Sequence, residues 1–388
     1  MAPPGGSTRD VLHVAVLQTD PTAGSTAQNL ARASALVDRL VAQARGTVGL
    51  LVAPEIGFGR YILDAEGARA AARDEGQILA WAAAVARALG CHVCVGHVRA
   101  DARTGEMYNS QTTLNDRGER IVVYDKTHLY FVDEKWAVES KTGFAQTSLS
   151  LKVMRTTTDR GGDDDAAATT TGRGDDAKRS DDAKKSDDAK KSDDAKKSDD
   201  ASTTRRVAVA VTNAICMDIN PYRFEAPWHA HELARAAAGS DLIVFSSAWT
   251  SAHPDDPSET KAAPVDPSQV LSYWVARLEP LLGARDAPVF VCANRVGVED
   301  EIQFTGCSCV IDLRRRAPRV LTVATDGKES IRTCLVPLGP LDDDSDDDDE
   351  TEEEEDGDDE GNDEEGDGDV GEETLGHGAG TPQAQTTT

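Results

Sequence analysis

The sequence lacks any long apolar run, and no window of its 388 residues reaches the length that a membrane span requires. Residues 1–10 contain no apolar stretch either, so no secretory signal is predicted. The seven cysteines are scattered through strand-like segments instead of forming the framework of a small disulfide-rich protein. We therefore expect reduced thiols and a cytoplasmic location, with the nucleus as the alternative.

Motifs for nucleotides and metals are also missing. No GxxxxGK[ST] loop and no GxGxxG fingerprint occurs, so nucleotide binding has no support. Cys91-His-Val-Cys94 has no second cysteine pair, and Cys307-Ser-Cys309 places both thiols on one face of a predicted strand. Packing is the simpler interpretation of both pairs. We expect no metal and no organic cofactor.

Charge is distributed unevenly. Of the net charge of -28, the segment from Asp342 to Glu373 contributes 23 acidic residues without a Lys or Arg, which leaves about -5 for the rest. Residues 342–388 have too few apolar side chains to form a core, so we expect a disordered, solubilising tail. The mildly acidic remainder argues against nucleic acid as a partner.

A second biased stretch lies at about 156–205. It contains DDAKRS once and DDAKKS three times, which indicates a tolerated surface insertion, because long loops cost little extra closure entropy. With a flexible terminus at 1–10, the expected organisation is one domain over 11–341, interrupted by this insert.

Hydrophobic periodicity predicts mixed helices and strands in that domain. Helices are expected at Asn29–Arg45, Asp74–Leu89 and Pro267–Gly283, and a further one from Asn220-Pro221 to Ala238. Strand pairs without an intervening helix favour a layered α/β (α+β) domain over a plain doubly wound sheet. The strands are expected at Val11–Gln18, Val48–Pro54, Cys91–Val98, Asn109–Asn115, Arg120–Asp125, Arg206–Cys216, Asp241–Ser247, Pro288–Ala293, Gln303–Asp312, Val320–Thr325 and Ser330–Val336.

Three polar residues follow predicted strands: Glu55, Lys126 and Cys216. Singly, each has an ordinary explanation as a solvated charge or a small apolar core residue. Together they supply what hydrolysis of a carboxamide needs, namely a proton carrier, a cation for the oxyanion and a sulfur nucleophile. Lys126 and the amino end of the helix predicted at Asn220 are expected to lower the pKa of the Cys216 thiol.

The surrounding motifs are Pro54-Glu55, Tyr124-Asp-Lys126-Thr-His-Leu129 and Ile215-Cys216-Met-Asp218. They resemble the three motifs of the nitrilase (carbon–nitrogen hydrolase) superfamily, in the same order and strand contexts. The resemblance implies an αββα sandwich with Glu55, Lys126 and Cys216 as catalytic residues. Its members often associate into homo-oligomers, so self-association stays open for this chain.

A narrower resemblance is carried by Cys216-Met-Asp-Ile-Asn-Pro-Tyr-Arg-Phe-Glu-Ala-Pro-Trp228 and by Asp133-Glu-Lys-Trp136. These segments are similar to fungal protein N-terminal amidases, and so are Ser247-Ala-Trp249, Tyr273-Trp274 and Asn294-Arg-Val-Gly-Val-Glu-Asp300. The implied reaction is deamidation of N-terminal Asn or Gln, the first step of a degradation signal. The alternatives are a small-molecule amidase, nitrilase or carbamoylase, and a non-enzymatic binding protein that has kept the fold.

Further site residues follow from these segments. Glu134 matches a fourth carboxylate of some family amidases and is expected to support Lys126, with Asp133 and Glu139 as neighbouring alternatives. The Met217 backbone N–H is expected to hold the oxyanion. Asp218 either pairs with a substrate ammonium group or caps the following turn. Trp249, Asn294 and Arg295 are the remaining candidates for substrate binding.

Overall fold

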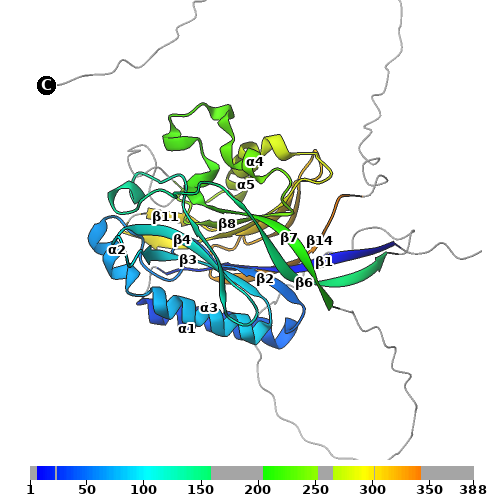
Figure 1. Cartoon of the computed structure of the whole chain (residues 1–388), viewed down its shortest axis with the longest axis horizontal. Coiled ribbons are helices and arrows are strands. Elements are labelled where there is room, and N and C mark those ends of the chain that lie inside the picture. Colours follow the sequence, from blue (N-terminus) through cyan, green and yellow to red (C-terminus); the bar gives the residue numbers. More distant parts are fainter. Residues whose placement is uncertain (1–6, 22–23, 159–203, 252–264, 301, 342–388) are drawn as a thin grey trace, which may run out of the picture. The chain divides into compact units, whose positions relative to one another are not determined.

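The computed structural model describes residues 7–21, 24–158, 204–251, 265–300 and 302–341. Most strands belong to one sheet with the order β13-β12-β9-β8-β7-β6-β1-β2-β3-β4-β5, and β14 pairs with β1 (Figure 1). Their bounds are β1 Ser7–Gln18, β2 Val48–Val52, β3 His92–Ala100, β4 Met107–Leu114, β5 Arg120–Asp125, β6 Gln146–Thr158, β7 Thr204–Ile215, β8 Leu242–Ser247, β9 Val289–Asn294, β12 Cys309–Asp312, β13 Arg319–Val323 and β14 Ser330–Pro337. A separate hairpin pairs β10 (Val296–Glu299) with β11 (Ile302–Thr305).

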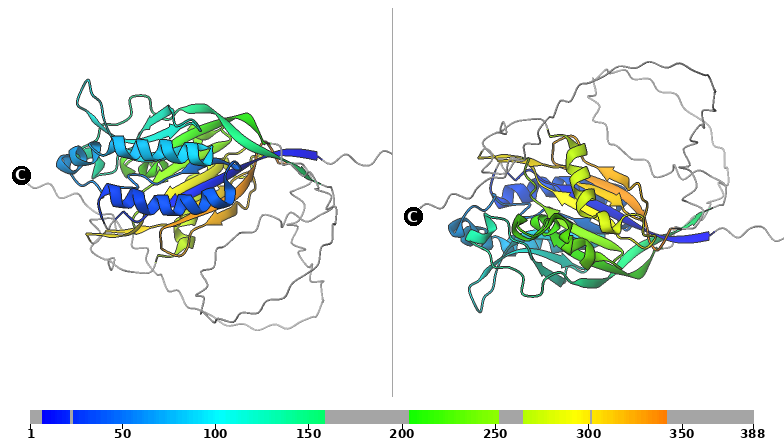
Figure 2. Two further views of the ribbon diagram at one scale, coloured as in Figure 1. Left: turned by 90° about the horizontal axis from the view of Figure 1, so that it is seen from below. Right: turned by 90° about the horizontal axis from the view of Figure 1, so that it is seen from above.

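Four α-helices cover the outer faces of this sheet. Helices α1 (Thr26–Ala44) and α3 (Glu75–Leu89) lie along one side, and α4 (Glu232–Ala237) and α5 (Pro267–Arg277) lie along the other (Figures 1 and 2). Ser25 starts α1 with a capping box that includes Gln28, and α3 ends at Gly90 in the left-handed conformation. These end signals fix where the helices begin and stop.

Alternation along the strands separates three apolar layers. In β2, Leu50 lies in the cluster between the two halves of the sheet, whereas Leu51 packs toward α1 and α3. In β8, Val244 joins the same inner cluster, and Phe245 packs toward α5. Because successive side chains of a strand point to opposite faces, each half of the sheet is buried on both of its faces. The predicted αββα sandwich is confirmed.

Several boundaries differ from the sequence prediction. Strand β1 begins at Ser7, before the expected start at Val11, and β7 begins at Thr204, before the expected start at Arg206. Strands β6 (Gln146–Thr158) and β10 (Val296–Glu299) were not predicted. The expected strand Gln303–Asp312 is broken between β11 and β12, where Cys307 has a φ of 60°. The rest of the predicted insert and the tail at 342–388 lie outside the described residues. The element α2 (Ala65–Ala72) was not predicted.

The helix expected from Asn220 to Ala238 is wrong. Short 3-10 turns, η4 (Tyr222–Phe224) and η5 (Trp228–Ala230), occupy most of this segment, and only α4 is α-helical. Arg223, Phe224 and His231 have φ values of 55°, 56° and 43°, which are incompatible with a right-handed helix. Pro227 also lacks the N–H that a continuous helix would need.

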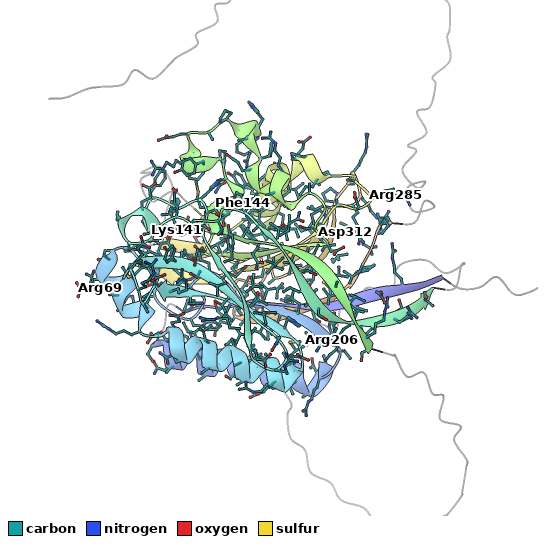
Figure 3. All side chains as sticks on the ribbon, viewed as in Figure 1. Arg69, Lys141, Phe144, Arg206, Arg285 and Asp312 are labelled. Atoms are coloured by element: carbon teal, nitrogen blue, oxygen red, sulfur yellow. The ribbon has the colours of Figure 1, made fainter. Side chains whose placement is uncertain are left out.

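Side chains fill the space between these layers, and exposed cations such as Arg69, Arg206 and Arg285 lie at the periphery (Figure 3). The two halves of the sheet are also joined by polar contacts in the interior. Gln111 of β4 donates to Ser246 Oγ of β8 at 2.7 Å and accepts a hydrogen bond from Asn213 of β7. No helix in the described segments is long and apolar enough to cross a membrane.

Candidate active site

Glu55 lies just after β2 and is almost completely buried. Its Oε1 accepts hydrogen bonds from Lys126 Nζ and Asn109 Nδ2, both at 2.7 Å, and its Oε2 accepts one from the Ala248 N–H at 2.7 Å. An ionised carboxylate is only an acceptor, so three donors hold it in one orientation. Sequence analysis predicted the glutamate but not the asparagine and backbone amide that orient it.

Lys126 follows β5 and has 1% of its side chain exposed. Its ammonium group is 2.7 Å from Glu55 Oε1 and 2.7 Å from Asp133 Oδ2. Burial disfavours the charged form, but the two carboxylates and the neighbouring Cys216 outweigh burial and raise the pKa of Lys126 well above its usual value. The residue is therefore a fixed cation and not a proton carrier.

The supporting carboxylate is Asp133, and the assignment of that role to Glu134 is wrong. Asp133 begins the 3-10 turn η1 (Asp133–Lys135) and is 3% exposed, whereas the Glu134 side chain faces Arg223 Nε at 3.3 Å. A 3-10 turn repeats every three residues, so Asp133 shares its face with the buried Trp136. The three-residue spacing between Asp133 and the apolar Trp136 was therefore the feature of the sequence that could have identified Asp133.

Cys216 follows β7 and begins the 3-10 turn η3 (Cys216–Ile219) with a φ of 44°. This left-handed conformation costs a non-glycine residue about 1–3 kcal/mol and is retained where the surroundings impose it. Burial and the Glu55 carboxylate raise the pKa of the thiol well above its usual range, although Lys126, Ser247 and Ala248 act in the opposite direction. The expectation of a lowered pKa is wrong for the free protein, because burial and the charge of Glu55 outweigh the effect of Lys126.

Two further residues surround the sulfur without having been predicted. Ser247, at the end of β8, is fully buried, and its hydroxyl acts on the Cys216 thiol and lowers the pKa of that thiol. Tyr61 lies in the loop after Glu55. Burial and the charges of Asp133, Glu55 and Cys216 raise the pKa of its phenol, which places that ring beside the same cluster.

Asp218 has a structural role, but it does not cap the following turn as one of its two interpretations expected. Its Oδ1 accepts from the N–H groups of Thr127 at 3.0 Å and His128 at 2.7 Å. Its Oδ2 accepts from the Ile215 N–H at 2.7 Å and the Tyr124 hydroxyl at 2.8 Å. Four donors saturate a fully buried carboxylate, so Asp218 joins the segment after Lys126 to the turn at Cys216 instead of meeting a substrate ammonium group.

The other predicted site residues are buried or partly buried in contacts of their own. The Asn294 side chain accepts from the Trp249 N–H at 2.9 Å and donates to Thr305 Oγ1 at 3.0 Å, which makes it a brace between loops. The guanidinium of Arg295 pairs with Glu299 at 2.9 Å and lies 4.3 Å from the centre of the Phe304 ring. Met217 is buried, and its sulfur accepts from Asn220 Nδ2 at 3.3 Å. Of the predicted substrate-binding set, only the Trp249 ring is partly exposed.

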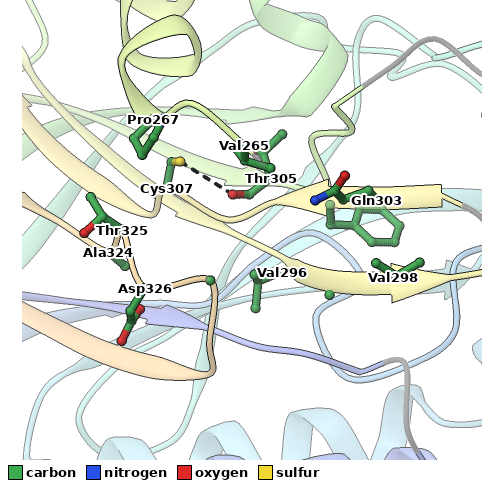
Figure 4. Close-up of a pocket in the computed structure, with 13 residues that line it drawn as sticks. Val265, Pro267, Val296, Val298, Gln303, Thr305, Cys307, Ala324, Thr325 and Asp326 are labelled. Atoms are coloured by element: carbon green, nitrogen blue, oxygen red, sulfur yellow. Dashed lines mark hydrogen bonds between the residues drawn. The ribbon is translucent and has the colours of Figure 1, made fainter. Parts of the chain in front are cut away.

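The remaining cysteine motifs are part of the core, as predicted. Cys91, Cys94, Cys307 and Cys309 are all buried in apolar clusters. A cavity of about 310 Å³ lies beside Cys307, lined by the β10–β11 hairpin and the segment 324–327 (Figure 4). Glu55, Lys126 and Cys216 are not among its lining residues.

Comparison with known proteins agrees with this geometry. Residues 13–162 match the carbon–nitrogen hydrolase family. The protein N-terminal amidase of Schizosaccharomyces pombe is 33% identical over 116 residues, which are 26% of this chain and 39% of that protein. The protein N-terminal amidase of Saccharomyces cerevisiae is 23% identical over 245 residues, 61% of this chain and 45% of that protein. The matched segments thus span less than half of either relative.

Solved structures share the fold. A crystal structure of N-terminal amidase superposes with a TM-score of 0.63 at 17% identity and covers 86% of this chain and 99% of that one. A carbon–nitrogen hydrolase from Helicobacter pylori G27 gives a TM-score of 0.56 at 16% identity, over 84% of this chain and 88% of that one. Residues 13–162 are therefore similar to the carbon–nitrogen hydrolase family, and the chain resembles the fungal protein N-terminal amidases.

Proposed function

We propose that this protein deamidates N-terminal Asn or Gln of peptides and proteins to Asp or Glu and releases ammonia. The observation that carries the proposal is the convergence of Glu55, Lys126 and Cys216 at the ends of β2, β5 and β7. The relatives named above are protein N-terminal amidases, and the structural neighbours include N-terminal amidase crystallised with Asn-Glu and Gln-Val peptides.

The geometry supports a thioester mechanism. Glu55 takes the proton of the Cys216 thiol as the sulfur adds to the carbonyl carbon of the side-chain carboxamide. The oxygen of the tetrahedral intermediate gains negative charge beside Lys126 and the Met217 N–H at the amino end of η3. Glu55 then returns the proton to nitrogen, the carbon–nitrogen bond breaks and ammonia leaves. Water, deprotonated by Glu55, attacks the thioester and releases the acid and the thiol.

The raised pKa of Cys216 fits this sequence of steps. Burial and the Glu55 carboxylate raise the pKa of the thiol and so favour its protonated form in the free protein, which fits transfer of the proton as the sulfur adds to the substrate. Lys126 keeps its charge throughout because Asp133 and Glu55 stabilise the ammonium form. Its contribution is electrostatic, which preserves Glu55 as the group that carries protons.

Mass spectrometry of peptides beginning with Asn, Gln or acetyl-Asn tests the proposal. Conversion of the first two to acids, with the acetylated peptide unchanged, is expected. Cys216→Ala should abolish conversion while leaving the circular dichroism spectrum intact. Equal hydrolysis of the acetylated peptide would assign the chain to the small-molecule amidases, and turnover by the Cys216→Ala variant would refute the thioester mechanism.

A further inference from the structure

We propose that Phe131, Tyr222, Phe224 and Trp228, hereafter the aromatic face, bind the substrate polypeptide immediately beyond its first residue. This inference rests on the proposed function and names where the rest of the substrate lies. Among the described residues, these are the large aromatic side chains that are exposed, and Trp228 is exposed most, at 53%. They come from just two segments, one following Lys126 and one following Cys216.

Ring contacts connect this face to the reacting groups. Phe131 and Phe224 lie 5.8 Å apart between ring centres and so bring the two segments together. Trp228 is 5.7 Å from Tyr273, which is 5.3 Å from Trp249. Trp249 directly follows Ala248, whose N–H holds Glu55. In this proposal, a peptide whose first side chain reaches Cys216 leaves the site past these rings.

Arg277 holds Trp228 of the aromatic face in place. The Arg277 guanidinium lies 4.5 Å from the centre of the Trp228 ring and donates to the carbonyl groups of Trp228 and Ile219. Arg223 and Phe224 keep left-handed backbone conformations that favour glycine. Strain of this kind persists where the rest of the fold imposes it and is concentrated at functional sites.

The chemistry of the face favours apolar peptide side chains. Neighbouring polar groups are already paired, since Tyr222 donates to Glu139 at 2.7 Å and Arg223 contacts Glu134 at 3.3 Å. Apolar or aromatic peptide side chains would bury the most surface against the rings themselves. The ring centres of Trp249 and Tyr273 lie 5.3 Å apart, and those of Tyr273 and Trp228 lie 5.7 Å apart. Each residue of an extended peptide advances about 3.3 Å, so the path along these rings corresponds to about three residues.

Substrate length and sequence test this directly. We would compare kcat/KM for Asn followed by three glycines with that for Asn followed by Leu-Phe-Leu. The wild-type protein should prefer the apolar peptide by about tenfold, which corresponds to about 1.4 kcal/mol. Trp228→Ala and Phe224→Ala should each remove most of this preference. Val320→Ala, which shortens an exposed apolar side chain on β13, is the matched control and should retain it.

The outcomes separate this inference from the proposed function. Equal turnover of the two peptides by the wild-type protein, or an unchanged preference in both aromatic variants, overturns the aromatic face as a peptide site. If no peptide is turned over, anisotropy of a labelled peptide beginning with Asp decides: Trp228-dependent binding supports the face while deamidation fails. A dimer that Trp228→Ala dissociates, with the preference unchanged, would make the face a subunit interface and overturn the proposal. Because Trp228 covers Arg277, thermal melts of both variants establish that they are folded.

Discussion

The Lys126 ammonium group lies 2.7 Å from Asp133 and at the same distance from Glu55. Two buried carboxylates therefore share one buried cation, and only one of them, Glu55, also contacts the backbone beside Cys216 through Ala248. This asymmetry divides the roles, since Glu55 can exchange protons with the reacting groups while Asp133 fixes the charge and position of Lys126. The predictions below begin from this division.

Asp133→Asn should lower kcat by about 10²-fold, within the range for loss of electrostatic stabilisation of an oxyanion, because Lys126 would keep one carboxylate instead of two. Steady-state kinetics on an Asn-initiated peptide measure this. Glu134→Gln is the matched control, since its carboxylate faces Arg223 and not Lys126. A larger loss from the Glu134 variant than from the Asp133 variant would restore Glu134 to the supporting role.

Ser247→Ala should reduce kcat/KM by about tenfold or more without loss of stability. Its buried hydroxyl acts on the Cys216 thiol and lowers the pKa of that thiol, so its loss should affect the sulfur more than the fold. Ser246→Ala should do the reverse and lower stability, since Ser246 donates to the Ala53 carbonyl at 2.8 Å and accepts from Gln111 at 2.7 Å. Kinetics and urea denaturation of both variants check this contrast; normal activity in Ser247→Ala would exclude the hydroxyl from the reaction.

Arg277→Lys should lower both the melting temperature and kcat. A lysine cannot reach both the Ile219 and Trp228 carbonyl groups with the geometry of a guanidinium, so the turn that starts at Cys216 loses a support. Buried acceptors left without donors cost about 1–3 kcal/mol each. Arg235→Lys provides the control, because Arg235 donates to the His229 carbonyl at 3.1 Å in an exposed position. Equal effects from the two substitutions would contradict the role given to Arg277.

Stability below neutral pH should depend on His97. Burial lowers the pKa of this imidazole from 6.5 to about 4, and its Nε2 lies 2.8 Å from Thr112 Oγ1. Between these two values the unfolded chain binds a proton that the folded protein excludes, so the free energy of unfolding rises with pH over this range. The contribution is about 1.4 kcal/mol per pH unit. Urea denaturation from pH 4 to pH 7 should show a shallower dependence for His97→Gln, and an identical slope would contradict the prediction.

The fold class and the three candidate catalytic residues could be predicted from the sequence. Strand alternation and helix end signals are local properties, so β2, β5, β7, α1 and α3 were predicted nearly at their observed bounds. Glu55, Lys126 and Cys216 each follow such a strand, and their motifs resemble those of one superfamily. The strand sets the position of a residue that directly follows it. These three residues could therefore be predicted without a structure.

The tertiary structure decided every role that depends on which way a side chain points. Asp133 and Glu134 are neighbours of similar chemistry. Only the packing of η1 directs Asp133 toward Lys126 and Glu134 toward Arg223. The sequence left two interpretations of Asp218 open. In the structure its carboxylate accepts four hydrogen bonds, most of them from segments far away along the chain. The pKa of Cys216 likewise depends on burial and on Glu55, which is far away along the chain. Such contacts join residues with no local relation in sequence, so no local pattern encodes them.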